Sequence, residues 1–220
     1  MAYGLIQTIA PTSEPLSVAT LKSHLRLNIN TDDQLLSIYI TTARSLIEDW
    51  TGRQLLPATF IQYLDSFSHY YRSWGGFYGM DTPRLWNGHS WWHRPLLLPK
   101  APCIAVQSIT YLDSNLATQT LDPTTYSVDN TRDPCRILLT TFPTVNPSVI
   151  PTIQITFTAG YSIVPVPLVH CIMLLASDFY RAREASSELT FAKLPYGFQS
   201  LLNAYKVFDM SCCYDTDRRH

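Results

Sequence analysis

Charged residues are scarce in this chain: only 15% of its 220 residues are Asp, Glu, Lys or Arg. This fraction is well below the quarter or so that is usual in soluble proteins. The 16 basic and 17 acidic residues nearly cancel, so the sequence lacks the basic excess expected of an electrostatic nucleic-acid binder. We expect a soluble chain so poor in charge to cover part of its apolar surface with partners.

Long hydrophobic runs and a cysteine framework are also missing. The longest apolar stretch, residues 163–176, is interrupted by Pro165, Pro167 and His170 and is shorter than the roughly 18 residues of a membrane span. The first residues show no basic segment before an apolar one, so we expect no secretory signal. The five cysteines, an odd number without repeated spacing, predict reduced thiols in a cytoplasmic setting.

Catalytic and metal-binding motifs are equally scarce. The sequence has no glycine-rich phosphate loop and no GxSxG elbow. Cys171 follows His170, but neighbours on a helix point to different faces, which disfavours a nucleophile–base pair. His89 and His93 have a spacing that could hold a metal on a helix, with His69 as a further ligand, although the flanking tryptophans and proline disfavour a helix there. We therefore predict no catalytic residue, no metal and no cofactor, with a histidine-metal enzyme as the less favoured alternative.

The N-terminal third carries helix signals. Ser17 is a candidate N-cap of a short helix. Thr31 and Gln34 fit a capping box, and Gly52 stands where a left-handed residue ends a helix, which together predict a long helix over residues 32–51. The expected buried stripe of this helix is Leu35, Ile38, Tyr39, Thr42, Leu46, Ile47 and Trp50.

The middle of the chain carries strand signals, and the last third returns to helix. The predicted strands are residues 60–67, 95–99, 104–112, 126–128, 136–140 and 152–158. Strands grouped between helices indicate an α+β fold, with N- and C-terminal helices in a bundle and an inserted antiparallel β subdomain. We expect one compact domain whose parts are the helical residues 1–56, the β insertion 57–162, the helical residues 163–205 and a flexible tail over residues 206–220.

Residues 69–94, within the β insertion, form an aromatic-rich loop without a regular period. This loop holds four of the five tryptophans. It could fold back over the sheet as a satellite core, contact another protein, or stack on sugars or bases. The last alternative would make the chain a binding module for carbohydrate or another ligand. The candidate contact residues are Tyr70, Tyr71, Trp74, Phe77, Tyr78, Trp86, Trp91 and Trp92.

Three groups of residues occur in an order typical of one protein family. The first contains Ala43-Arg44, Ile47-Glu48 and Thr51-Gly52-Arg53; the second reads SITYLD over residues 108–113; the third reads FTAGY over residues 157–161. With these motifs, residues 16–205 resemble the head–tail connector (adaptor) family of tailed bacteriophages, in the subgroup with a β insertion between the helices.

The resemblance implies a non-enzymatic protein of the virion neck that assembles in the host cytoplasm. Twelve copies would form a ring beneath the portal protein and link it to the next neck, stopper or tail protein. DNA would pass through the ring as cargo during packaging, retention and ejection. The resemblance also implies portal contacts for the C-terminal residues Phe198, Leu201, Leu202, Tyr205, Val207, Phe208 and Met210.

Charged residues near the ends of two predicted helices give candidate contacts between ring subunits. They are Arg44, Glu48, Asp178, Arg181 and Arg183. The alternative is a solvated surface without a partner.

Overall fold

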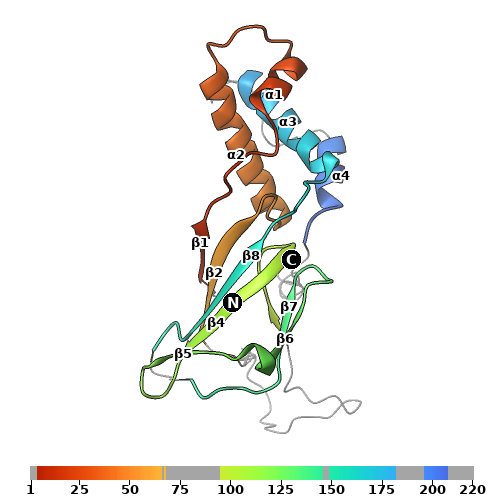
Figure 1. The fold of residues 1–220 in the computed structure, drawn as a ribbon. Helices are drawn as coiled ribbons and strands as arrows, with labels where there is room; N and C mark the ends of the chain where they lie inside the picture. The colour runs from red at the N-terminus through yellow and green to blue at the C-terminus, as the bar shows by residue number, and fades with distance from the viewer. Residues whose placement is uncertain (1–3, 66, 68–94, 146–148, 182–195, 208–220) are drawn as a thin grey trace, which may run out of the picture.

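The protein has a helical end and a β end that follow one another along a long axis (Figure 1). The computed structural model describes residues 4–65, 67, 95–145, 149–181 and 196–207. The helices are α1 (Val18–Leu25), α2 (Asp33–Thr51), α3 (Val166–Arg181) and α4 (Tyr196–Asn203). The strands are β1 (Gly4–Ile9), β2 (Ala58–Leu64), β3 (Leu96–Leu97), β4 (Cys103–Leu112), β5 (Thr118–Thr120), β6 (Tyr126–Asp129), β7 (Arg136–Leu139) and β8 (Ile153–Ala159). The predicted α+β class is confirmed.

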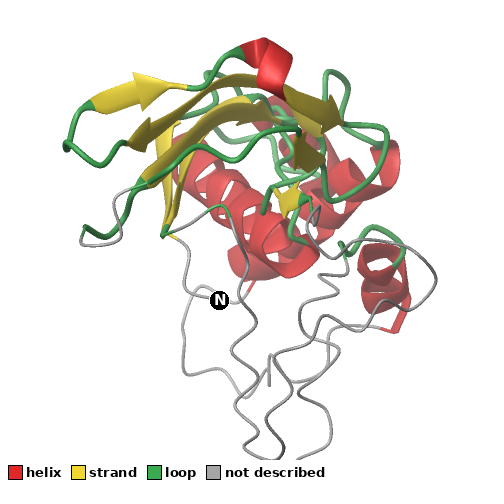
Figure 2. Cartoon of the chain, turned by 90° about the horizontal axis from the view of Figure 1, so that it is seen from below, coloured by secondary structure: helices red, strands yellow, loops and turns green. Residues whose placement is uncertain are grey.

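Two antiparallel sheets build the β end. The larger sheet has the strand order β1-β2-β8-β4-β5, and the smaller one has the order β3-β7-β6. Side chains from both sheets form one apolar core, in which the rings of Phe60 and Phe157 stack with centroids 5.7 Å apart. Figure 2, seen from the β end, shows the strands nearer the viewer than the helices.

A second apolar core lies among the four helices. α2 packs along α3, and α1 and α4 contact both of these helices. Leu36, Ile40 and Ile47 of α2 meet Leu168 and Ile172 of α3 in this core. Within the described part of the chain, none of the helices is both long and apolar enough to cross a bilayer.

The start of α2 differs from the prediction. Ser17 caps α1 as expected, because its Oγ accepts a hydrogen bond of 3.1 Å from the Thr20 backbone. The N-cap of α2, however, is Asp32, without a side-chain cap bond, so the predicted capping box at Thr31 is wrong. The Asp32 carboxylate instead accepts a 2.7 Å hydrogen bond from the hydroxyl of Tyr180 on α3. A tertiary bond to α3 therefore takes the place of a local cap.

The buried face of α2 is also not the predicted stripe. The buried apolar residues are Leu36, Ile40, Ala43 and Ile47. Four members of the predicted stripe face solvent instead: Thr42 is exposed, and Ile38, Leu46 and Trp50 are 55%, 47% and 44% exposed. The helix carries apolar residues on more than one side, so its periodicity fits two different buried stripes. Packing against the other helices decides which of the two stripes is buried.

Candidate functional site

The helical and β ends meet at a polar junction formed by residues 51–57, after α2, and residues 160–165, before α3. The Gln54 backbone N–H donates to the Ala101 carbonyl at 2.7 Å, which ties the exit of α2 to the entry of β4. The Gly160 N–H donates to the Pro102 carbonyl at 2.9 Å, and the Tyr161 N–H to the Leu55 carbonyl at 3.3 Å. Main-chain hydrogen bonds thus fix the two connecting segments to each other.

Arg53 joins three separate parts of the chain at this junction. Its Nε donates to the Tyr205 carbonyl, just after α4, at 2.5 Å. Its Nη1 donates to the Asp133 carboxylate, in the β6–β7 hairpin, at 2.6 Å and to the Tyr161 hydroxyl at 2.7 Å. The Arg53 side chain is only 14% exposed. A planar guanidinium with several fixed donors suits such a three-way contact better than an ammonium does.

The C-terminal segment leaves the described fold at the same place. The Val207 N–H donates to the Thr51 carbonyl at the end of α2, over 2.8 Å. Gly52 has the left-handed conformation predicted for it, with a φ of 69°, and a Cβ added there would lie 3.6 Å from the Val207 side chain. The motif Thr51-Gly52-Arg53 therefore ends α2 and also holds the segment that follows α4.

Gly160 allows the two connecting segments to approach closely. Its φ is 140°, and a Cβ built there would lie 2.5 Å from the Leu56 carbonyl carbon. Both the conformation and the space therefore require glycine. This contact explains the glycine of the FTAGY motif.

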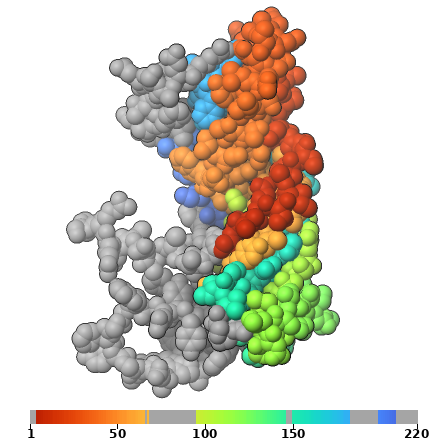
Figure 3. All heavy atoms as spheres, turned by 90° about the vertical axis from the view of Figure 1, so that its left-hand side faces the viewer, coloured from red at the N-terminus to blue at the C-terminus, as the bar shows by residue number. Residues whose placement is uncertain are grey.

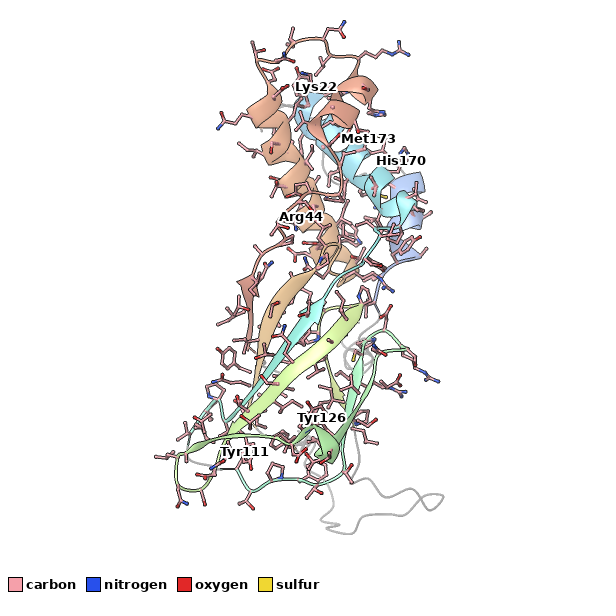
Figure 4. All side chains as sticks on the ribbon, viewed as in Figure 1. Lys22, Arg44, Tyr111, Tyr126, His170 and Met173 are labelled. Atoms are coloured by element: carbon pink, nitrogen blue, oxygen red, sulfur yellow. The ribbon has the colours of Figure 1, made fainter. Side chains whose placement is uncertain are left out.

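A buried ion network holds the lower half of α2. Arg44 donates from Nε to Glu14 at 2.7 Å and from Nη1 to Glu48 at 2.8 Å. The other carboxylate oxygen of Glu48 accepts from the Gln54 side chain at 2.9 Å and from the Leu55 N–H at 3.0 Å. Burial raises the pKa of Glu48 above its usual value, although the Leu55 hydrogen bond and the Arg44 charge oppose this rise. Figure 4 labels Arg44 on α2.

The polar contacts of the junction and of the ion network hold described segments of the chain together. Cys171 is buried, and burial raises the pKa of its thiol, whereas His170 is exposed on α3 (Figure 4). Among the described residues, no group of three or more His, Cys, Asp or Glu could hold a metal ion. The histidines of the metal alternative, His69, His89 and His93, lie outside the described residues.

The N-terminal part of the chain is similar to a known protein family. Residues 15–73 match the model of the phage gp6-like head-tail connector proteins. The predicted resemblance to head–tail connectors is thereby confirmed. The matched segment contains α1, α2, Thr51-Gly52-Arg53 and β2, so it includes residues 51–57 of the junction but not residues 160–165. No curated protein sequence matches the chain significantly.

Solved structures share the fold over nearly the whole chain. A chain from the virion of a native gene transfer agent particle has a TM-score of 0.69 and 22% identity, covering 93% of this chain and 96% of that chain. A chain from the neck of the empty particle, computed with C6 symmetry, has a TM-score of 0.66 and 21% identity over 94% and 96% of the two chains. A chain from the neck of the native particle, computed with C12 symmetry, has a TM-score of 0.63 and 22% identity over 95% and 97%.

Most described residues of the expected portal contact lie in or against the helical core. Phe198 and Leu202 of α4 are buried in this core, and Leu201 and Tyr205 pack against it while half-buried. Val207 is half-buried at the junction. Phe208 and Met210 lie outside the described residues. The accessible part of this segment is therefore the edge of α4 and Val207, whereas Phe198 and Leu202 are buried.

The expected subunit contacts divide into two groups. Arg44 and Glu48 have their charges bound within the chain, as the network above shows. Asp178 and Arg181 are exposed at the end of α3. Arg183 lies outside the described residues, as does the whole aromatic loop from Tyr70 to Trp92.

Two surface features of the described structure were not predicted from the sequence. The first is an apolar groove of about 200 Å³ between α2, α3 and α4, lined by Leu46, Ile47, Trp50, Leu175, Phe179, Phe198 and Leu202. The second is the larger sheet, in which none of the five strands contains a charged residue. Figure 3 shows parts of β1, β2, β8 and β4 next to one another on the molecular surface.

Proposed function

We propose that this chain is a structural head–tail connector in the neck of a phage-like particle, with no enzymatic activity. The observation that carries the proposal is the match of residues 15–73 to the head-tail connector model. The fold likeness to chains of gene transfer agent necks, over more than nine-tenths of this chain, supports it. In this role the protein joins the portal to the next neck or tail protein.

The connector acts as a ring of copies of this chain. The similar neck structure with C12 symmetry supports a twelvefold ring. Each copy is nearly neutral, with 16 basic and 17 acidic residues. Since phosphate binding strengthens with each Lys or Arg contact, such a ring lets DNA pass without holding it.

The C-terminal segment after α4 binds the portal, and the helices form the wall of the ring. Val207 is fixed to the end of α2 by a main-chain hydrogen bond, and Arg53 binds the Tyr205 carbonyl, so the described end of this segment has a defined position. Asp178 and Arg181, exposed at the end of α3, are available for contacts between neighbouring copies.

Particles that lack this protein test the proposal. We expect them to package DNA, to lose it from the head and to fail to join tails, because the ring beneath the portal is missing. A plasmid copy of the gene should restore both functions, and electron microscopy of the restored particles should show the ring. Particles that retain DNA and carry tails without the protein would contradict the proposal.

A further inference from the structure

The apolar groove between α2, α3 and α4 is suited to side chains of a protein. Its volume is about 200 Å³, and the described residues that line it are all apolar. Leu46 and Trp50 of α2 line the groove and are exposed. Pockets for small ligands usually measure about 300–1,000 Å³ and carry a few polar groups that orient the ligand. The apolar groove is smaller and has no polar side chain in its described lining, so it fits apolar side chains better than a small molecule.

A second apolar surface lies at residues 163–167, which run into the first turn of α3. These five consecutive residues are all apolar, and each is exposed or half-buried. Ile163 and Val166 are 85% and 79% exposed, the largest fractions among the large apolar side chains of the described residues. Single exposed apolar side chains are normal, whereas contiguous ones indicate a contact surface for a partner.

The 163–167 segment is held in place before any partner binds. Upstream, the Tyr161 N–H donates to the Leu55 carbonyl at 3.3 Å, and downstream the Leu168 N–H donates to the Pro165 carbonyl at 2.9 Å. Pro165 and Pro167 also have fixed φ angles. A segment that is already ordered loses little conformational entropy on binding, which favours its use as a contact.

The groove and the segment belong to different sides of the same molecule. Val166 and Leu175 lie nine residues apart on α3, which is about two and a half helical turns, so their side chains point to opposite sides of the helix. Leu175 lines the groove, so Val166 points away from the groove of its own chain. Residues 161–169 contain no charged residue, and neither does the described groove lining, so no like charges oppose a contact between them.

We propose that the 163–167 segment of one copy docks into the apolar groove of the next copy. This inference rests on the proposed function, in which copies of this chain form a ring. A contact between two different surfaces of one chain repeats from copy to copy and closes into a ring when the rotation between copies allows it. The contact removes Ile163 and Val166 of one copy, and Leu46 and Trp50 of the next, from water.

Cross-linking within assembled particles tests this contact. The full chain carries C212S and C213S, so that the described native cysteines, Cys103, Cys135 and Cys171, are buried. Leu46→Cys and Ile163→Cys are then added together, particles are assembled with this protein, and a short bismaleimide is applied. We expect a ladder of covalent oligomers on a denaturing gel. Either cysteine alone should give monomers, because the two surfaces differ.

Two controls use Ile150, which lies in the loop before β8 and is 73% exposed. Leu46→Cys with Ile150→Cys should give no ladder. Ile163→Asp should leave the Tm of the free protein unchanged, because the side chain is exposed, but should lower the amount of protein per particle several-fold. Ile150→Asp should lower neither. If the cysteine pair itself prevents incorporation, the two aspartate variants decide the question.

The outcomes separate this contact from the connector role. If the double-cysteine protein is present in particles but remains monomeric on the gel, the docking contact is overturned and the connector role stands. Dimers formed by either single cysteine, or equal incorporation of Ile163→Asp and Ile150→Asp, also overturn the contact. Absence of the wild-type protein from particles would instead refute the proposed function.

Discussion

Replacing Arg53 by alanine tests whether the junction holds the two ends of the molecule together. The substitution removes hydrogen bonds to the Tyr205 carbonyl, the Tyr161 hydroxyl and the Asp133 carboxylate. Hydrogen bonds to a charged group contribute about 1.5–3 kcal/mol each when buried, and exposed ion pairs contribute about 0–1 kcal/mol. Because Asp133 is partly exposed and the other two contacts are partly buried, we expect the free energy of unfolding to fall by roughly 3 kcal/mol. In a chain of this size, that loss lowers Tm by about 6–12 °C.

Calorimetry and amide hydrogen exchange together measure this effect. In Arg53→Ala the Val207 amide, bonded to the Thr51 carbonyl, should exchange faster, because the neighbouring Tyr205 carbonyl loses its donor. The matched control is Arg132→Ala, which removes an exposed arginine from the same hairpin as Asp133 and should leave Tm within about 1 °C. Arg53→Lys should lie between the two, since a lysine cannot reach all three acceptors at once. A Tm of Arg53→Ala equal to that of the wild type would refute the role of Arg53.

Three more perturbations have defined outcomes. Gly160→Ala should lower the free energy of unfolding by about 4 kcal/mol or more, because its Cβ would lie 2.5 Å from the Leu56 carbonyl carbon at a φ of 140°. Gly4→Ala is the control, because the nearest atom to its added Cβ lies at 3.4 Å. Equal Tm values for the two variants would disprove the close approach at Gly160. Burial raises the folded-state pKa of Glu48 above 4.5, so the contribution of Glu48 to stability falls as the pH rises through 4.5 toward the folded pKa. In urea unfolding, the free energy of unfolding should fall less over this pH range for Glu48→Gln than for the wild type. The same pH profile for both proteins would contradict this sign. Deleting residues 208–220 should leave Tm unchanged but weaken co-purification with the portal, and full retention of portal binding would exclude the tail as the binding segment.

The sequence predicted the fold class and most elements because their signals are local. The long helix was expected over residues 32–51 and is α2, Asp33–Thr51. Gly52 was expected to be left-handed, and it is. β1 and β5 were not predicted, because β1 contains a glycine and β5 is the polar triplet Thr118–Thr120, which presents no apolar pattern.

The junction could not be predicted, because its partners are distant in sequence. Arg53 meets Asp133 across 80 residues, Tyr161 across 108 and Tyr205 across 152. No periodicity relates positions so far apart, and Asp133 lies in a hairpin with ordinary turn composition. The family motif contained Arg53, but only the structure shows what its guanidinium binds. The same limit applies to Arg44 and Glu48, which the sequence suggested as subunit contacts and whose charges are bound inside the chain.

The uncharged larger sheet has a consequence for how its surface responds to the medium. Its outer row runs from Ile6 through Ile61 and Thr156 to Ser108, and these side chains are exposed or half-exposed. Mobile ions screen the attraction between exposed charges, largely so beyond about 8 Å at physiological ionic strength, but this screening does not act on contacts between uncharged groups. A contact made through this face would therefore not be screened by salt, whereas the proposed contacts of Asp178 and Arg181 at the end of α3 would weaken as the salt concentration rises.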